Sequence, residues 1–250
     1  MKISSLKMQD HLIASSLANA ELFSNNLIVG PNGVGKTRIL NNIKQAVATD
    51  AKHIPIFLIK DKGYDLTEIT KAAKRYDLSF DIALTDILKN DIDIIRAVEP
   101  NFGSMSVVDG SIAVTFKDGI TCINVEDMGK GFGRLIEILL NCYYLYDGVL
   151  LIDDVELGLQ QSHYSKVISC IIEYAKVQRN QVFMTTHSND VVECYSEYTS
   201  VKRCFDDHKV NASLIRLGSS VRELNRGEVV AAMFDEQTLK NMLDMGIRLA

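Results

Sequence analysis

The chain has 250 residues, a net charge of −5 and a composition that is 47% hydrophobic and 24% charged. This balance excludes a largely disordered chain, a collagen-like repeat and a surface that binds nucleic acid throughout. The longest apolar runs are far below the roughly 18 residues that span a bilayer, and the first residues do not predict a secretory leader. We therefore expect a cytoplasmic protein with one domain over residues 1–250 and no membrane association. The five cysteines lack zinc-like or C-x-x-C spacing, so free, buried thiols are expected.

Strand and helix patterns alternate through the first half of the chain. The expected elements are a strand at Leu27–Val29, a helix from Lys36 to about Ala48, a strand at Ile54–Ile59 and two helices within 65–98, which form a helical lobe of about 64–100. A hairpin is expected next, because strand patterns at Met105–Val108 and Ile112–Phe116 flank Asp109-Gly110, a dipeptide favoured in type I′ turns. A further strand is expected at Ile120–Val125.

The second half continues the alternation. Its expected elements are a helix from about Arg134 to Tyr146 after a glycine-rich stretch at 129–133, a strand at Val149–Ile152, a helix over Gln160–Gln178, a strand at Val182–Thr186, strands near Ser200–Phe205 and Asn211–Leu217, and a last helix near Asp235–Met245. Strands that alternate with helices predict an α/β fold with a mainly parallel central sheet. The hairpin predicts an attached antiparallel sheet, and the tail of about 200–250 adds strands and a helix.

One segment carries a complete phosphate-binding pattern. The spacing G-x-x-x-x-G-K-[ST] is met at every fixed position by Gly30, Pro31, Asn32, Gly33, Val34, Gly35, Lys36 and Thr37. The glycines let backbone N–H groups and the start of the following helix face phosphate oxygens. Lys36 would reach the β- and γ-phosphates, and the Thr37 hydroxyl would bind Mg²⁺. The pattern therefore predicts binding of a nucleoside triphosphate with Mg²⁺.

Acidic residues and a histidine follow two buried strands of the second half. Asp153 ends the strand at Val149–Ile152, where a carboxylate would hold Mg²⁺, and Asp154 could orient or deprotonate an attacking water. Either aspartate could instead cap the following turn. His187 ends the next strand, at the edge of the sheet where α/β proteins bind ligands, and could contact the γ-phosphate or the water.

Together these motifs resemble a known group of ATPases. The run Met128-Gly129-Lys130-Gly131, the segment 149–159 and the run Thr185-Thr186-His187-Ser188 are similar to the ABC-type ATPase heads of the SMC, RecF and OLD (overcoming lysogenization defect) groups. The likeness is strongest to compact relatives of the OLD proteins that lack a TOPRIM nuclease segment and a coiled-coil insertion. It covers nearly the whole chain and implies a P-loop NTPase fold of the ABC-head type.

The resemblance implies a role for each motif. It assigns ATP and Mg²⁺ to the residues from Gly30 to Thr37, Mg²⁺ also to Asp153, the catalytic-carboxylate position to Asp154 and the switch histidine to His187. The signature residues Gly129, Lys130 and Gly131 would contact ATP that is bound to a second subunit. The resemblance thus implies a homodimer that closes on ATP and opens after hydrolysis.

Two departures from the group bear on turnover. The catalytic position usually holds Glu, and Asp154 is one methylene shorter. Because a misplacement of about 1 Å can cost about a hundredfold in rate, slow hydrolysis is expected, with Glu156 as a partial substitute. Lys130 is unusual in the signature, and it either acts in trans on the γ-phosphate or is a solvated turn residue. A glutamine of the Q-loop type is not identifiable beside Lys60 and Asp61.

Two functions are compatible with these features. The first is a Mg²⁺-dependent ATPase that acts as a nucleotide-gated dimer and drives or licenses a separate effector or nuclease in DNA repair or anti-phage defence. The second is a regulatory nucleotide-binding module with little turnover that signals by assembly with an effector, which the shorter Asp154 favours. DNA or RNA stays open as a partner. A transporter subunit is disfavoured, because the Leu-Ser-Gly-Gly-Gln signature is absent.

Overall fold

A computed structural model describes residues 22–50, 54–60, 79–109, 111–205, 212–219 and 229–250. Its central feature is a sheet of six strands in the order β2-β6-β7-β1-β8-β9. These strands are β1 (Asn25–Val29), β2 (Ile56–Ile59), β6 (Val149–Ile152), β7 (Gln181–Thr186), β8 (Ala212–Ser219) and β9 (Val229–Asp235). Neighbouring strands are parallel except for β8 and β9, which pair antiparallel. The predicted α/β class with a mainly parallel sheet is confirmed.

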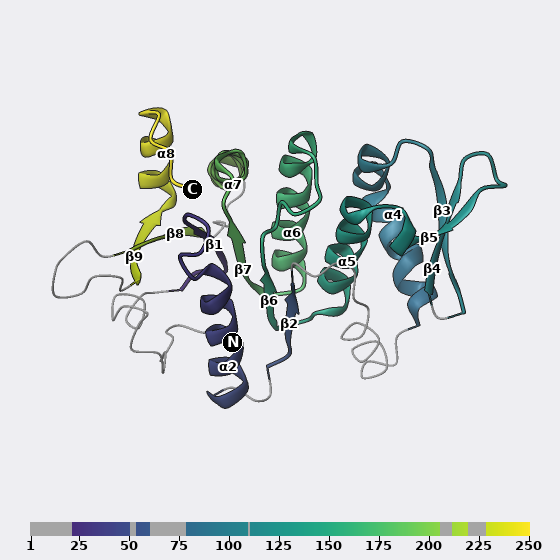
Figure 1. The fold of residues 1–250 in the computed structure, drawn as a ribbon, viewed down its shortest axis with the longest axis horizontal. Coiled ribbons are helices and arrows are strands. Elements are labelled where there is room, and N and C mark those ends of the chain that lie inside the picture. The colour runs from purple at the N-terminus through teal and green to yellow at the C-terminus, as the bar shows by residue number, and fades with distance from the viewer. Residues whose placement is uncertain (1–21, 51–53, 61–78, 110, 206–211, 220–228) are drawn as a thin grey trace.

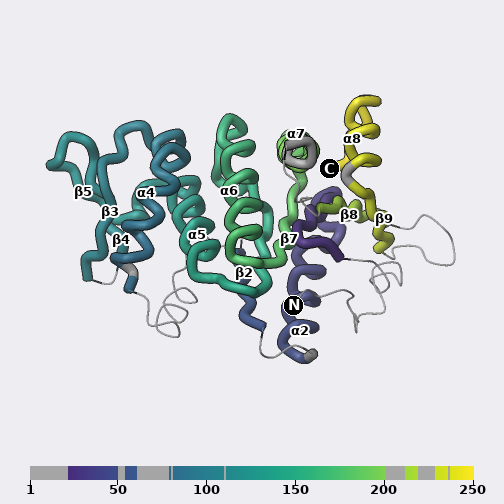
Figure 2. The backbone as a smooth tube through the Cα atoms, turned by 180° about the vertical axis from the view of Figure 1, so that it is seen from behind, coloured from purple at the N-terminus to yellow at the C-terminus, as the bar shows by residue number. Residues whose placement is uncertain are grey.

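Helices cover both faces of this sheet (Figure 1). They are α2 (Lys36–Asp50) on one face and α5 (Lys130–Tyr144), α6 (Tyr164–Val177), α7 (Asn189–Phe205) and α8 (Glu236–Asp244) on the other, and Figure 2 shows the second group from behind. In β1, Leu27 belongs to the apolar cluster under α5, α6 and α7, whereas Ile28 belongs to the cluster with Ile39 of α2. A strand buried on both faces needs this arrangement, which explains the unbroken apolar runs. Among the described helices, none is long and apolar enough to cross a membrane.

A second, antiparallel sheet lies beside α4 (Phe80–Val98) at one end of the molecule (Figure 1). Its strands are β3 (Phe102–Val108), β4 (Ser111–Phe116) and β5 (Cys122–Asn124), in that order. Asp109 has a left-handed φ of 51°, as the expected tight turn requires. The attached antiparallel sheet is therefore confirmed. Of the two helices expected within 65–98, α4 is observed, and the other lies outside the described residues.

Hydrogen bonds fasten α4 to the helices of the core. Asp91 accepts a hydrogen bond from Tyr174 Oη of α6 at 2.5 Å and one from Cys170 Sγ at 3.6 Å. Asp86 accepts one from Tyr143 Oη of α5 at 2.7 Å. Burial raises the pKa of Asp91, although both of its donors favour the charged form. Hydrogen bonds from tyrosine hydroxyls to the carboxylates of Asp86 and Asp91 thus hold α4 against the core, in addition to apolar contacts.

The structure corrects several local expectations. The helix α5 begins at Lys130 rather than near Arg134, so the glycine-rich stretch is largely helical. Ser200–Phe205 was expected as a strand but ends α7, because the buried residues earlier in that helix outweigh a short local preference for extended structure. The strand β9 lies where no element was expected, between the expected strand that ends at Leu217 and the expected helix that begins near Asp235. Cys122, Cys142, Cys170 and Cys194 are free, as expected, but only Cys142 of these four is buried, and Cys122 is exposed.

Ile171 tests the packing of α6 on the sheet. Its side chain is fully buried, whereas Val177 at the end of the same helix is 72% exposed. Ile171→Ala leaves a cavity, so we expect a loss of about 2–5 kcal/mol in the free energy of unfolding. Val177→Ala is the matched control, with an expected change of less than about 0.5 kcal/mol. Urea denaturation of both variants measures the difference, and equal effects would contradict this packing.

Candidate functional site

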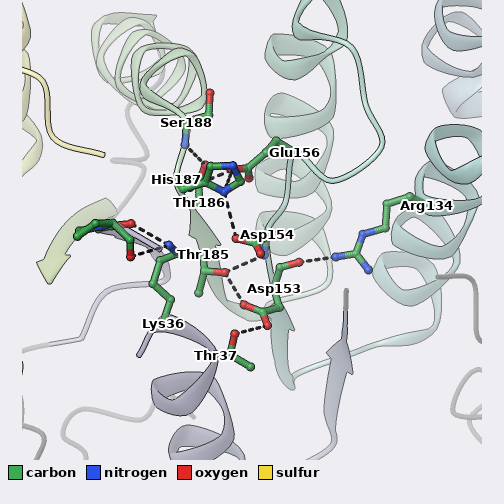
Figure 3. Close-up of polar contacts among 12 residues, drawn as sticks. Lys36, Thr37, Arg134, Asp153, Asp154, Glu156, Thr185, Thr186, His187 and Ser188 are labelled. Carbon is green, nitrogen blue, oxygen red and sulfur yellow. Dashed lines mark hydrogen bonds and ion pairs between the residues drawn. The ribbon is translucent and has the colours of Figure 1, made fainter. Parts of the chain in front are cut away.

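The predicted motifs meet at the carboxyl edge of the central sheet. The strands β6, β7 and β1 are neighbours, and their pairing puts Val29 beside Thr186 and Ile152 beside Met184. Because these strands are parallel, the segments that follow them leave the sheet at one edge. Figure 3 shows Lys36, Asp153 and His187, one from each of these segments, gathered there.

The predicted phosphate-binding loop has the backbone that its sequence requires. Gly33 and Gly35 have φ values of 80° and 106°, which strain any residue with a side chain. The side chain of Lys36 is buried, and its Nζ donates to the carbonyl oxygens of Gly30 at 2.7 Å and Pro31 at 3.3 Å. The ammonium group therefore lies within the loop, at the start of α2. The positive end of the helix dipole and the ammonium charge both favour an anion here.

The carboxylate of Asp153 joins the three segments. Its side chain is only 3% exposed. Thr37 Oγ1 donates to Oδ2 at 2.7 Å, and Thr185 Oγ1 donates to Oδ1 at 2.6 Å. Thr185 Oγ1 also accepts a hydrogen bond from the backbone N–H of Asp154 at 2.8 Å. Carboxylate and hydroxyl oxygens are ligands that suit Mg²⁺, so the predicted pair Thr37 and Asp153 lies together and fits this ion.

Asp154, Glu156 and His187 form a second cluster beside Asp153 (Figure 3). His187 Nδ1 lies 3.0 Å from Glu156 Oε1 and 3.5 Å from Asp154 Oδ1. Glu156 Oε1 also accepts hydrogen bonds from Thr186 Oγ1 at 2.7 Å and from the His187 N–H at 2.9 Å. The Glu156 side chain is buried, whereas Asp154 and His187 are partly exposed. The buried Glu156 therefore orients the ring of His187, and the side chains of Asp154 and His187 are accessible to a ligand.

Arg134 is a buried residue of the site that sequence reasoning missed. One of its terminal nitrogens donates to the carbonyl oxygen of Lys60 at 2.5 Å, and the other donates to that of Asp153 at 2.5 Å. Burial lowers the pKa of Arg134, and the nearby carboxylate of Glu137 opposes this effect. The guanidinium thus ties α5 to the ends of β2 and β6. The sequence signal for this role was the pair Arg134 and Glu137, which is spaced i and i+3 within the otherwise apolar stretch 132–140.

The predicted signature lies at an exposed corner against the segment that follows Asp153. Gly129 and Lys130 are exposed, and Gly129 precedes α5 with a φ of 90°. A Cβ atom on Gly131 would overlap the carbonyl oxygen of Gly158. Gly131 is therefore required by a close approach of two backbones. The signature and the turn at Gly158 form one surface.

Gly131→Ala tests this close approach. The added methyl group forces the two backbones apart, so we expect a loss of about 1–3 kcal/mol in the free energy of unfolding. Gly218→Ala in β8 is the matched control, because a Cβ atom there meets nothing within 4 Å. Chemical denaturation measures both variants. A Gly131→Ala protein as stable as the control would show that the two segments are not packed together.

Comparison with known proteins identifies the fold. No family model matches the chain. The probable ABC transporter ATP-binding protein p29 of Mycoplasma pneumoniae is 23% identical over 181 residues, which cover 68% of this chain and 73% of that protein. The structure of an Smc head bound to the C-winged helix domain of ScpA has a TM-score of 0.53 at 13% identity and covers 86% of this chain and 92% of that chain. For cbiO1 of Clostridium perfringens, part of the ABC transporter complex cbiONQ, the TM-score is 0.51 at 13% identity, with coverage of 92% and 88%.

These likenesses lie in the fold rather than in the sequence, with TM-scores just above 0.5 at 13% identity. They are too distant in sequence to carry over an activity, but two folds from different branches match most of the chain. The chain therefore has the P-loop NTPase fold of the ABC-type ATPase heads found in SMC proteins and ABC transporters.

Proposed function

We propose that this chain binds ATP with Mg²⁺ and hydrolyses it slowly as a nucleotide-gated homodimer in the cytoplasm. The observation that carries the proposal is the Asp153 carboxylate, which is hydrogen-bonded to Thr37 of the phosphate-binding loop and to Thr185 of β7. A loop suited to phosphate, oxygens suited to Mg²⁺ and a histidine thus lie at one edge of the sheet. The ABC-type fold supports the same activity.

Nucleotide binding is the task of the loop and the first turn of α2. Backbone N–H groups of the loop face the phosphates, and Lys36 exchanges its two carbonyl partners for phosphate oxygens. That exchange is favourable, because a hydrogen bond between two charged groups is stronger than one to a neutral carbonyl. Thr37 and Asp153 hold Mg²⁺, which neutralises phosphate charge when it is bound.

Hydrolysis is the task of the cluster beside Asp153. Asp154 orients the attacking water and accepts its proton, and His187 contacts the γ-phosphate from the neighbouring strand. Glu156 fixes the ring of His187 through Nδ1. The backbone of Asp154 is held by Thr185 and has a left-handed φ of 45°, so it cannot shift easily to compensate for the shorter side chain. Turnover is therefore slow.

The homodimer closes when ATP on one chain meets the signature of the other. Gly129 and Lys130 are exposed at the start of α5, where the first N–H groups of a helix lack partners within the helix. Such a terminus favours the γ-phosphate of the opposite chain. Lys130 adds a positive charge to that phosphate in trans.

The biological setting is proposed from the motifs. Their likeness to OLD, RecF and SMC heads favours DNA repair or anti-phage defence. The chain is a single ATPase domain over residues 1–250, and the ATP-bound dimer drives or licenses a separate effector or nuclease.

A second candidate is a regulatory module that binds ATP, turns it over hardly at all and signals by assembly with an effector. Asp154 favours this function, because a carboxylate that reaches the water poorly leaves the bound state long-lived. The two candidates share the binding site and differ in the rate of hydrolysis.

Variants of the site separate binding from turnover. We expect Lys36→Ala to weaken Mg²⁺-ATP binding by a factor of ten or more, on the order of one lost charge-assisted contact. We expect Asp154→Asn to bind normally and to lose at least about 90% of turnover, because it removes the proton acceptor. A fluorescent ATP analogue measures binding, and phosphate release measures turnover. Wild-type binding without turnover would favour the regulatory module, and binding unaffected by Lys36→Ala would contradict both candidates.

Mixing two inactive variants tests the dimer. Lys36→Ala disables the binding loop, and Lys130→Ala disables the signature of the same chain. In a mixed dimer, the intact loop of one chain meets the intact signature of the other, so an equal mixture should recover about a quarter of the wild-type rate. Phosphate release from the separate and mixed proteins provides the measurement. Full activity of Lys130→Ala alone would show that Lys130 is only a solvated residue.

A further inference from the structure

The cluster of Asp154, Glu156 and His187 has the chemistry of a second cation site. One ligand atom from each of these side chains lies within 4.8 Å of the others. The Nδ1 atom of His187 is 3.0 Å from Glu156 Oε1 and 3.5 Å from Asp154 Oδ1. These three side chains do not include the Mg²⁺ pair Thr37 and Asp153. The two sets of ligands are therefore separate.

The buried carboxylate of Glu156 supplies an independent observation. Its side chain is 6% exposed. Oε1 is fully engaged by Thr186 and His187, but within the described residues no hydrogen-bond donor reaches the buried atom Oε2. The buried Oδ1 atom of Asp154 likewise accepts no hydrogen bond within that part of the chain. A buried carboxylate oxygen that accepts no hydrogen bond is costly, and a bound cation would satisfy both of these atoms.

The donor set favours a transition metal over Mg²⁺. An imidazole nitrogen suits Zn²⁺ and related ions, whereas Mg²⁺ prefers six oxygen ligands. Ligand atoms about 2.0–2.2 Å from such an ion lie about 3.0–3.5 Å from each other, depending on the bond angle. The separation of 3.5 Å between His187 Nδ1 and Asp154 Oδ1 falls in this range, and a carboxylate oxygen of Glu156 lies within 4.8 Å of the ligand atoms of both residues. Three protein ligands are enough to hold zinc, because a four-coordinate ion can take water in its fourth position.

We propose that Asp154, Glu156 and His187 bind a divalent transition-metal ion, with Zn²⁺ as the ion to test. His187 binds through Nδ1, and the proton of that nitrogen moves to Nε2 or to solvent. Binding of the ion does not depend on the proposed ATPase function.

The effect of the ion on turnover does rest on that function. The ion would hold the ring of His187 toward Glu156, and it would draw electron density from the Asp154 carboxylate, which would then be a weaker proton acceptor for an attacking water. Zinc would therefore slow hydrolysis and leave the phosphate-binding loop intact. It would act as an inhibitor that holds the protein in the nucleotide-bound state.

Zinc titration of the whole, nucleotide-free chain tests the site directly. The protein is first treated with a chelator, and zinc is then added in competition with a chromophoric zinc indicator. We expect one tightly bound zinc ion per chain in millimolar Mg²⁺. Both His187→Ala and the conservative Glu156→Gln should weaken binding by about tenfold or more, as expected for disturbed ligation. Circular dichroism confirms that both variants are folded.

Two controls distinguish zinc bound at this cluster from zinc bound elsewhere on the chain. Cys122→Ser removes the exposed thiol and should leave zinc affinity unchanged. Lys36→Ala should lose ATP binding and keep zinc binding, so failure of the ATPase proposal leaves the zinc result interpretable. Wild-type protein that binds no zinc, or equal affinity in wild type, His187→Ala and Glu156→Gln, would overturn the proposal. Zinc that binds but does not slow phosphate release would overturn only the inhibitory effect.

Discussion

The site depends on one buried carboxylate, that of Asp153. Each of its oxygens accepts a short hydrogen bond from a threonine hydroxyl of a different segment, Thr37 on one side and Thr185 on the other. A carboxylate that is buried without such partners loses several kcal/mol of solvation, on the order of the stability of a whole domain, so these contacts are strongly favoured. β6 lies beside β7, and β7 lies beside β1. The segments that follow these three strands are therefore neighbours at the edge of the sheet. The position of the phosphate-binding loop relative to His187 follows from this arrangement.

The excess of carboxylates over positive charges favours a cation at this site. Asp153, Asp154 and Glu156 lie within four residues of one another at the end of β6. The guanidinium of Arg134 contacts the carbonyl oxygen of Asp153 from the side of α5, so it supports the strand end without pairing with the carboxylates. Lys36 donates to loop carbonyls instead. The carboxylates therefore face the ligand side with little direct compensation from fixed positive charge.

Spacing allowed much of the site to be predicted, and tertiary contacts account for what was missed. The pattern from Gly30 to Thr37 and the apolar runs that become β1, β6 and β7 are local signals, since each needs only neighbouring residues. Strand order is not local, because any of several crossovers would bury the same runs. The hydroxyl of Thr185 and the guanidinium of Arg134 acquire their roles only from partners far along the chain. The close approach of Gly131 in α5 to Gly158 is likewise a tertiary contact, which no periodicity reveals.

That same contact links the proposed signature to the proposed catalytic cluster. Between Asp154 and Gly158 the backbone makes two tight turns, with hydrogen bonds from Leu157 N to Asp154 O at 2.9 Å and from Leu159 N to Glu156 O at 3.0 Å. Such turns leave little freedom for independent movement. Gly158 touches Gly131 backbone to backbone. The short, stiff segment from Asp154 to Gly158 therefore has the proposed water-binding carboxylate at one end and a contact with the proposed dimer corner at the other. These hydrogen bonds and the backbone contact thus fix the position of Asp154 relative to Gly131.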